Sequence, residues 1–157
     1  VSFTCIAVYV AMISQEGKTL TVVSLLGIFI WIIGFSIEVI SDSQKRKFRK
    51  EINNKGKFIS TGLWSRSRHP NYFGEITLWT GVSVIAVTSL NGIGYVALVS
   101  PLFVYMLLSK GSGIPLLERS ADKKWGQDVE YQNYKKNTPV LFPKFFNNIK
   151  NTNNNSN

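Results

Sequence analysis

The chain has 157 residues, of which 45% are hydrophobic, and its formal net charge is +9 at pH 7. One domain is the expectation for this length, and a single cysteine excludes both a disulfide framework and a cysteine-based zinc site. One histidine and nine scattered carboxylates show no metal-site pattern, and no nucleic-acid-binding motif of the usual kinds accompanies the basic charge.

Apolar stretches separated by polar, basic segments predict an all-α membrane fold. Residues 20–41 contain one formal charge, Glu38, and as a helix would be about 33 Å long, enough to cross a bilayer. Because the chain begins with Val1 and its first apolar stretch is short, we expect it to be N-terminally incomplete, with further spans upstream. We predict a multi-span transmembrane helical bundle with about four visible spans, at 2–14, 20–41, 76–90 and 93–109.

Lysine and arginine are distributed unevenly along the chain. Of the 18, nine lie in 45–68 and eight in 110–150, leaving only Lys18 elsewhere. Two predicted spans separate the basic blocks, so both blocks fall on one side of the membrane, which the positive-inside rule identifies as the cytoplasm. We therefore expect an integral, multi-pass protein with the basic loop 43–70 and the C-terminus cytoplasmic, where the charge also attracts anionic membrane lipids.

Local signals mark the elements on the cytoplasmic side. The run SQKRKFRKE (43–51) is expected to continue the second span as a helix until Asn53, Asn54 and Gly56 break it. Pro70 suits the first position of the third-span helix, because its missing N–H would be unpaired there anyway.

Beyond the fourth span, GSG at 111–113 loosens the chain before a polar, cytoplasmic C-terminal helix at about 116–136. Pro139 and Pro143 mark the end of the ordered part. We expect residues 1–146 to form the transmembrane domain and the polar, low-complexity residues 147–157 to be a disordered tail.

A first polar cluster lies at the end of the second span. Glu38, Asp42, Arg46 and Arg49 recur at helical spacing and share one face. An ion pair between Asp42 and Arg46 on a solvated helix end would explain part of the pattern. Alternatively, Arg46 and Arg49 bind a ligand phosphate while Asp42 orients them, because arginine forms forked hydrogen bonds to phosphate.

The octet RHPNYFGE (68–75) is the second cluster and contains the only histidine, His69. Asn71 and Glu75 lie four residues apart and face one way, at a helix start whose free N–H groups favour anions. The alternative is a capped helix entry with Glu75 paired to a neighbouring span. A charge inside a membrane helix is a functional-site hypothesis by default, which favours a ligand role.

A third cluster follows the fourth span. Glu118 and Asp122 share a helical face, as do Tyr131 and Tyr134. Trp125 is as consistent with an anchor at the membrane interface as with a functional role. Because all three clusters fall on the same side of a helical bundle, we predict that they form one shared pocket.

Three segments carry a family resemblance: SDSQKRKFR (41–49), GLWSRSRHPNYFGEI (62–76) and LLERSADKKWGQDVEYQNYKKNTPVLFP (116–143). In this order they resemble the steroid 5-alpha-reductase-like membrane family, in particular its bacterial uncharacterised branch. Sterol reductases and isoprenylcysteine carboxyl methyltransferases are related to this family.

The resemblance implies an NADPH-dependent reductase of a C=C bond in a steroid- or lipid-like enone. Its cytoplasmic half would hold the cofactor, while the catalytic acid is expected upstream of Val1. No metal is implied. The clusters and the resemblance together assign cofactor binding to Asp42, Arg46, Arg49, Arg68, His69, Asn71, Tyr72, Glu75, Glu118, Arg119, Asp122, Tyr131 and Tyr134.

Two alternatives stay open. The related S-adenosylmethionine-dependent methyltransferases, of the isoprenylcysteine or phospholipid type, also carry an RHP-x-Y motif and later acidic residues. Arg46 and Arg49 favour the reductase, because NADPH has phosphates and S-adenosylmethionine has none. The third possibility is a non-enzymatic membrane assembly protein, against which the presence of Asn71 and Glu75 argues. Neither the substrate nor an oligomeric state follows from the sequence.

Overall fold

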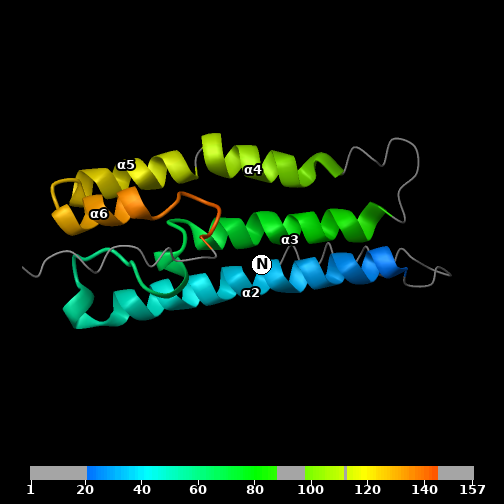
Figure 1. Cartoon of the computed structure of the whole chain (residues 1–157), viewed down its shortest axis with the longest axis horizontal. Coiled ribbons are helices and arrows are strands. Elements are labelled where there is room, and N and C mark those ends of the chain that lie inside the picture. Colours follow the sequence, from blue (N-terminus) through cyan, green and yellow to red (C-terminus); the bar gives the residue numbers. More distant parts are fainter. Residues whose placement is uncertain (1–20, 88–97, 112, 145–157) are drawn as a thin grey trace, which may run out of the picture.

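The computed structural model describes residues 21–87, 98–111 and 113–144, and every regular element in these ranges is helical (Figure 1). The prediction of an all-α fold is therefore confirmed for the described part of the chain. The apolar stretch 2–14 and the tail 147–157 lie outside it. The elements are α2 (Val22–Lys50), η1 (Ile52–Asn54), η2 (Gly62–Ser65), α3 (Pro70–Val87), α4 (Ser100–Lys110), α5 (Ile114–Trp125) and α6 (Val129–Asn137).

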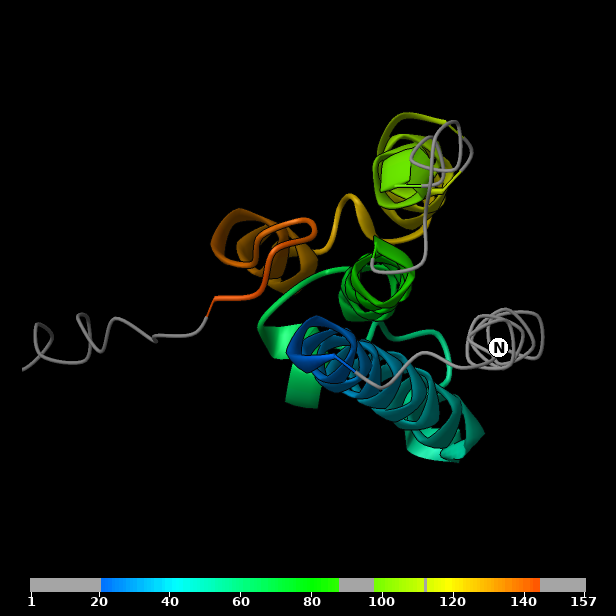
Figure 2. The ribbon, with the colours of Figure 1, turned by 90° about the vertical axis from the view of Figure 1, so that its right-hand side faces the viewer.

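The helices run back and forth along one long axis. α3 lies antiparallel to α2, α4 packs against α3, and α5 continues almost in line with α4 (Figure 1). α6 then turns back beside α5, and the end-on view in Figure 2 shows the α4–α5 column and α2 on either side of α3. The end of α2, the start of α3 and the pair α5–α6 therefore meet at one end of the molecule, which we call the polar end.

α2 is long and apolar enough to cross a membrane, the one described helix that meets this criterion. Thr21 caps its start, because its side-chain oxygen accepts a hydrogen bond from Ser24 N at 3.1 Å. Much of its apolar surface is outward, including Leu25, Phe29 and Ile32. The helix continues to Lys50 through the basic run, as predicted, and α3 begins at Pro70, also as predicted. The multi-span arrangement itself stays a prediction.

Small residues bring α2 and α3 into very close contact. Gly27 and Gly34 on α2 face Gly81 and Gly74 on α3, seven residues apart on each helix. A Cβ atom at Gly34 would lie 2.3 Å from the backbone N of Leu78, a distance that no real packing tolerates. Backbones that approach this closely are typical of helix pairs in membranes, where small residues replace a hydrophobic driving force.

The loop between α2 and α3 is held against the end of α2. Gln44 Oε1 accepts a hydrogen bond from Leu63 N at 2.9 Å, and Trp64 Nε1 donates to Ser41 O at 3.0 Å. Gly62 adopts a φ of 62°, and a side chain there would also collide with the Gln44 amide. These contacts fix the position of Trp64 and of the octet that follows it.

The polar segment predicted as one helix at about 116–136 is instead two helices. α5 ends at Trp125, the N–H of Gly126 closes the last turn on Asp122 O at 2.8 Å, and α6 begins after Asp128. Asp128 caps α6 by accepting a hydrogen bond from Glu130 N at 2.8 Å. The resulting hairpin turns α6 back toward the start of α3.

Residues 138–144, which we call the C-terminal strap, cross the loop in front of α3. Pro139 O accepts a hydrogen bond from Arg68 N at 2.9 Å, and Lys144 N donates to Arg66 O at 3.0 Å. Between them, Ser67 Oγ donates to the carbonyl oxygen of Leu141 at 2.8 Å. The strap therefore fixes the backbone immediately before Pro70.

Candidate functional site

The polar end contains a cavity of about 310 Å³. The end of α2, the following loop, the start of the octet and the α5–α6 hairpin all contribute to its lining. Its charged lining consists of five cations and one carboxylate: Lys45, Arg49, Lys57, Arg68, Lys124 and Glu118. Such an excess of positive charge in a partly enclosed space favours an anionic ligand.

A carboxylate clamp lies at the centre of this lining. Glu118 accepts hydrogen bonds from Arg68 Nη1 through one oxygen and from His69 Nε2, at 2.8 Å, through the other. Arg68 and Glu118 are fifty positions apart in the sequence, so the fold alone brings them together. His69 is buried and stacks on Tyr72, with ring centroids 5.7 Å apart.

The clamp determines the charge state of Glu118. Burial by itself would raise the pKa of this carboxyl, but the hydrogen bond from His69 and the positive charges nearby, led by Arg68, lower it overall. Lys135 contributes as well, with its Nζ 4.0 Å from Glu118 Oε2. The clamp is therefore an ionised carboxylate at neutral pH.

We expect this ionisation to make stability depend on pH in the acid range. Because the pKa of Glu118 is lower in the folded state than the ordinary value of 4.5, the unfolded state binds the proton first. The stabilisation is complete above that value and is lost as the pH falls through the folded-state pKa. Thermal unfolding of the wild type and Glu118→Gln from about pH 7 to about pH 3 tests this, and the gap in Tm should narrow toward acid. A constant gap would contradict the assignment.

A second, more exposed set of contacts joins α5 to α6. Asp122 accepts hydrogen bonds from Lys135 Nζ at 2.5 Å and from the Tyr131 hydroxyl at 3.1 Å. The hydrogen bond from Lys135 lowers the pKa of Asp122, whereas burial and the bond to Asp122 raise the pKa of Tyr131. Asp122 and Glu118 thus share one helical face, as predicted, and Lys135 lies within reach of both.

Aromatic side chains form one wall of the cavity. Phe58 contacts Trp125, Tyr131 and Tyr134, with ring centroids between 5.3 and 6.1 Å apart. The Tyr134 hydroxyl donates to Trp64 O at 2.6 Å, and burial raises the pKa of that hydroxyl, so it stays protonated. This wall links α6 to the loop and offers flat apolar faces next to the cations.

The structure brings together part of each of the three predicted clusters. Within its described residues, the predicted site residues that line the cavity are Arg49, Arg68, His69, Glu118, Tyr131 and Tyr134. Tyr72 and Asp122 contact lining residues. The other predicted residues do not line it: Asp42, Arg46, Asn71, Glu75 and Arg119. Of these, Asp42 and Glu75 lie close enough to Tyr72 to act on it electrostatically, between α2 and α3.

Several lining residues were not anticipated. Lys45 lies one helical turn before Arg49, and its Nζ lies 4.6 Å from the centroid of the Trp64 ring. Helical spacing from Arg49 could have identified it. For Trp125 the sequence left an interface anchor and a functional role equally open; in the structure its Nε1 donates to Gly56 O and its ring lines the cavity. Lys57 and Phe58 lie in an irregular loop, where no periodic signal exists.

A phosphate-bearing nucleotide fits this lining. Arg68 Nε is buried and has no hydrogen-bond partner among the described residues, so the guanidinium retains an unused donor beside the clamp. The surrounding cations supply further donors for phosphate oxygens, and the aromatic wall supplies faces on which a base can stack. Residues that could hold such a group are Lys45, Arg49, Lys57, Arg68 and Lys124.

Comparison with known proteins gives three findings. The model of the family described as "Protein of unknown function (DUF1295)" matches residues 1–138. The chain is 30% identical over 123 residues to the "Probable O-methyltransferase ustE" of Ustilaginoidea virens, covering 78% of this chain and 41% of that protein. It is 29% identical over 119 residues to the "3-oxo-5-alpha-steroid 4-dehydrogenase 1" of Rattus norvegicus, covering 76% of this chain and 40% of that protein. The chain thus spans about two fifths of the length of these relatives. No solved structure matches it.

Proposed function

The chain belongs to the DUF1295 family, which is the steroid 5-alpha-reductase-like family, and on that premise we propose that it is a membrane-embedded, NADPH-dependent reductase. Its reaction would be the reduction of a C=C bond in a steroid- or lipid-like enone. In this proposal the chain crosses the membrane several times, with the polar end in the cytoplasm.

The observation that carries the proposal is the charge of the polar-end cavity. Five cations and one carboxylate line it, and the carboxylate is already bound to Arg68 and His69. NADPH carries phosphate groups, whereas S-adenosylmethionine carries a positively charged sulfonium and no phosphate. A cationic cavity attracts the phosphates of NADPH and repels the sulfonium of S-adenosylmethionine. The electrostatics therefore support a nicotinamide dinucleotide.

Different residues of the cavity would bind different parts of NADPH. When bound, NADPH supplies the hydride that the reduction requires. Arg68 would donate to a phosphate through its guanidinium, while Glu118 accepts from Nη1 and holds the side chain in position. Trp125 would offer a stacking face for the base and would exclude water from that side. Asn71 and Glu75 remain proposed cofactor contacts from the resemblance, on the first turns of α3.

A second candidate is an S-adenosylmethionine-dependent methyltransferase. It is favoured by the 30% identity to the probable O-methyltransferase, which is as high as the identity to the steroid dehydrogenase. In that case the aromatic wall would surround the ligand, and the five cations would have no phosphate to bind.

Ligand-dependent thermal stability distinguishes the two candidates. We expect NADPH to raise the Tm of the full-length protein in detergent and S-adenosylmethionine to leave it unchanged. At about 100 times its dissociation constant, a ligand adds roughly 2.7 kcal/mol to the free energy of unfolding. Stabilisation by S-adenosylmethionine alone would contradict the reductase and favour the methyltransferase, and no response to either ligand would favour a non-enzymatic assembly protein.

A matched pair of variants on α2 localises the binding. Arg49→Gln removes a cation from the cavity lining and should reduce the NADPH-dependent shift in Tm. Lys47→Gln removes an exposed cation of the same helix that lines neither described cavity, and it should respond like the wild type. Equal responses of the two variants would place the phosphates elsewhere.

A further inference from the structure

A second cavity, of about 330 Å³, lies between α2, η2, α3 and the C-terminal strap. It shares no lining residue with the polar-end cavity. Five of its lining residues are apolar and one is charged: Ile37, Leu63, Pro70, Phe73, Pro143 and Arg66. This lining suits an apolar chain that ends in a negatively charged group.

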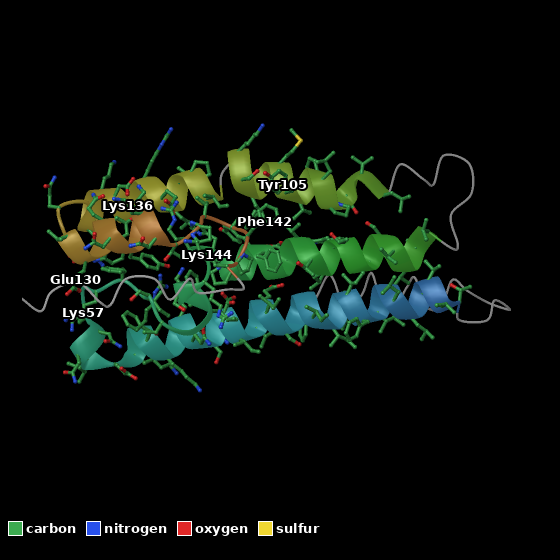
Figure 3. The ribbon with its side chains drawn as sticks, viewed as in Figure 1. Lys57, Tyr105, Glu130, Lys136, Phe142 and Lys144 are labelled. Atoms are coloured by element: carbon green, nitrogen blue, oxygen red, sulfur yellow. The ribbon has the colours of Figure 1, made fainter. Side chains whose placement is uncertain are left out.

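The strap fixes one wall of this cavity. Leu141 is buried, and its carbonyl oxygen accepts the hydrogen bond from Ser67, which places Pro143 over the cavity. Phe142 packs edge-on against Phe73 of α3, with ring centroids 6.1 Å apart, and Figure 3 shows it lying over the start of that helix. The wall is therefore held by backbone hydrogen bonds and by an aromatic contact.

Arg66 supplies the charge. Its backbone is fixed on both sides, because its N–H donates to Leu63 O at 3.1 Å and its carbonyl accepts from Lys144 N at 3.0 Å. Within the described part of the chain, its guanidinium makes neither a hydrogen bond nor an ion pair. Lys144, the cation at the end of the strap (Figure 3), already has a hydrogen-bond partner, because its Nζ donates to Asn137 O at 2.6 Å. Arg66 is therefore the cation available to a ligand of this cavity.

The cavity also lies where apolar side chains give way to basic ones. Ile37 belongs to the apolar stretch of α2, and Lys45 is only two turns further along the same helix. An anionic phospholipid has the same order of layers, with acyl chains next to a negatively charged phosphate. We propose that this cavity binds one acyl chain of an anionic phospholipid, with the headgroup phosphate on Arg66. The site rests on the insertion of α2 in a membrane and is independent of the reductase chemistry.

Lipid retention in detergent tests this site. Full-length protein is incubated with equal amounts of phosphatidylglycerol and phosphatidylcholine that carry the same acyl chains, and bound lipid is counted by native mass spectrometry. We expect the wild type to retain phosphatidylglycerol preferentially and Arg66→Gln to lose that preference by on the order of tenfold, because a charge-assisted hydrogen bond is lost. Arg66→Lys should restore part of the preference for phosphatidylglycerol, since lysine returns the positive charge but not the paired hydrogen bonds of a guanidinium.

Further variants test binding of the acyl chain separately from binding of the headgroup. Ile37→Phe and Leu63→Phe each narrow the cavity from a different wall. Each of them that folds normally should retain less phosphatidylglycerol and less phosphatidylcholine than the wild type. Lys136→Gln, on the exposed surface of α6 (Figure 3), lines neither cavity and should behave like the wild type. An unchanged lipid preference in Arg66→Gln would overturn the proposal, and so would complete displacement of phosphatidylglycerol by inorganic phosphate.

Discussion

Replacing Gly34 with leucine should prevent α2 and α3 from packing and leave little folded protein. Even the first atom of a side chain there would lie 2.3 Å from Leu78 N and 2.7 Å from the carbonyl oxygen of Gly74. Both are backbone atoms, so no rotamer change can relieve the collision and the helices must separate. Ordinary overpacking costs about 1–3 kcal/mol, and we expect a larger loss here because a whole helix pair is displaced.

The measurement is the fraction of protein that elutes as a monodisperse species from detergent, with the Tm of whatever is recovered. Gly34→Ala should give a smaller loss in the same direction. Val39→Ile is the matched control, because it adds a methyl group to the exposed side of the same helix and should leave both values unchanged. A Gly34→Leu protein with the wild-type Tm would mean that the two backbones do not approach as closely as described.

Arg68→Gln should produce the second large effect, because it acts on binding and on stability together. The substitution leaves Glu118 with His69 and with Lys135, whose Nζ is 4.0 Å away. Breaking a buried ion pair costs about 3–5 kcal/mol, and the nearby Lys135 should keep the loss at or below about 3 kcal/mol. NADPH should bind roughly tenfold to hundredfold more weakly, because a hydrogen bond to a charged group contributes about 1.5–3 kcal/mol.

The two effects can be measured separately. Thermal unfolding without ligand reports the loss of the clamp, and NADPH titration well below the Tm reports the loss of the phosphate contact. Arg68→Lys should recover part of the stability and part of the NADPH affinity, because lysine keeps the positive charge but not the paired hydrogen bonds of a guanidinium. Lys50→Gln, an exposed cation at the end of α2, serves as control. A destabilised Arg68→Gln protein that still binds NADPH at full affinity would confine Arg68 to a structural role.

The boundaries of α2 and α3 could be predicted because they depend on neighbouring residues. A long apolar run followed by basic residues with good helix propensity continues as a helix to Lys50, and a proline at position 70 starts the next one. The break at Gly126 has local signals of the same kind, a glycine and a capping aspartate. The prediction of one polar helix at about 116–136 did not use these two signals.

The composition of the site was only partly predictable. Arg49 was predicted from its spacing on the second span and its affinity for phosphate, Arg68 as part of the octet and Glu118 as part of the third cluster, and all three line the same cavity. Asn71 and Glu75 belong to the same octet as Arg68 and His69, but they lie on the first two turns of α3 and are not part of that lining. Lys57 and Phe58 have no periodicity that could have revealed them.

The sequence by itself determined that the described chain is helical, where its long apolar helix lies and which polar residues gather near the ends of the helices. These properties follow from propensity, hydropathy and capping, which act over a few residues. Only the tertiary structure decided which of those polar residues meet. Close packing of glycines aligns α3 with α2, and the turn at Gly126 folds α6 back beside α5. The packed helices also place Glu118 of α5 against Arg68, fifty residues earlier in the sequence, whereas Arg66, two residues before Arg68, lines a different cavity.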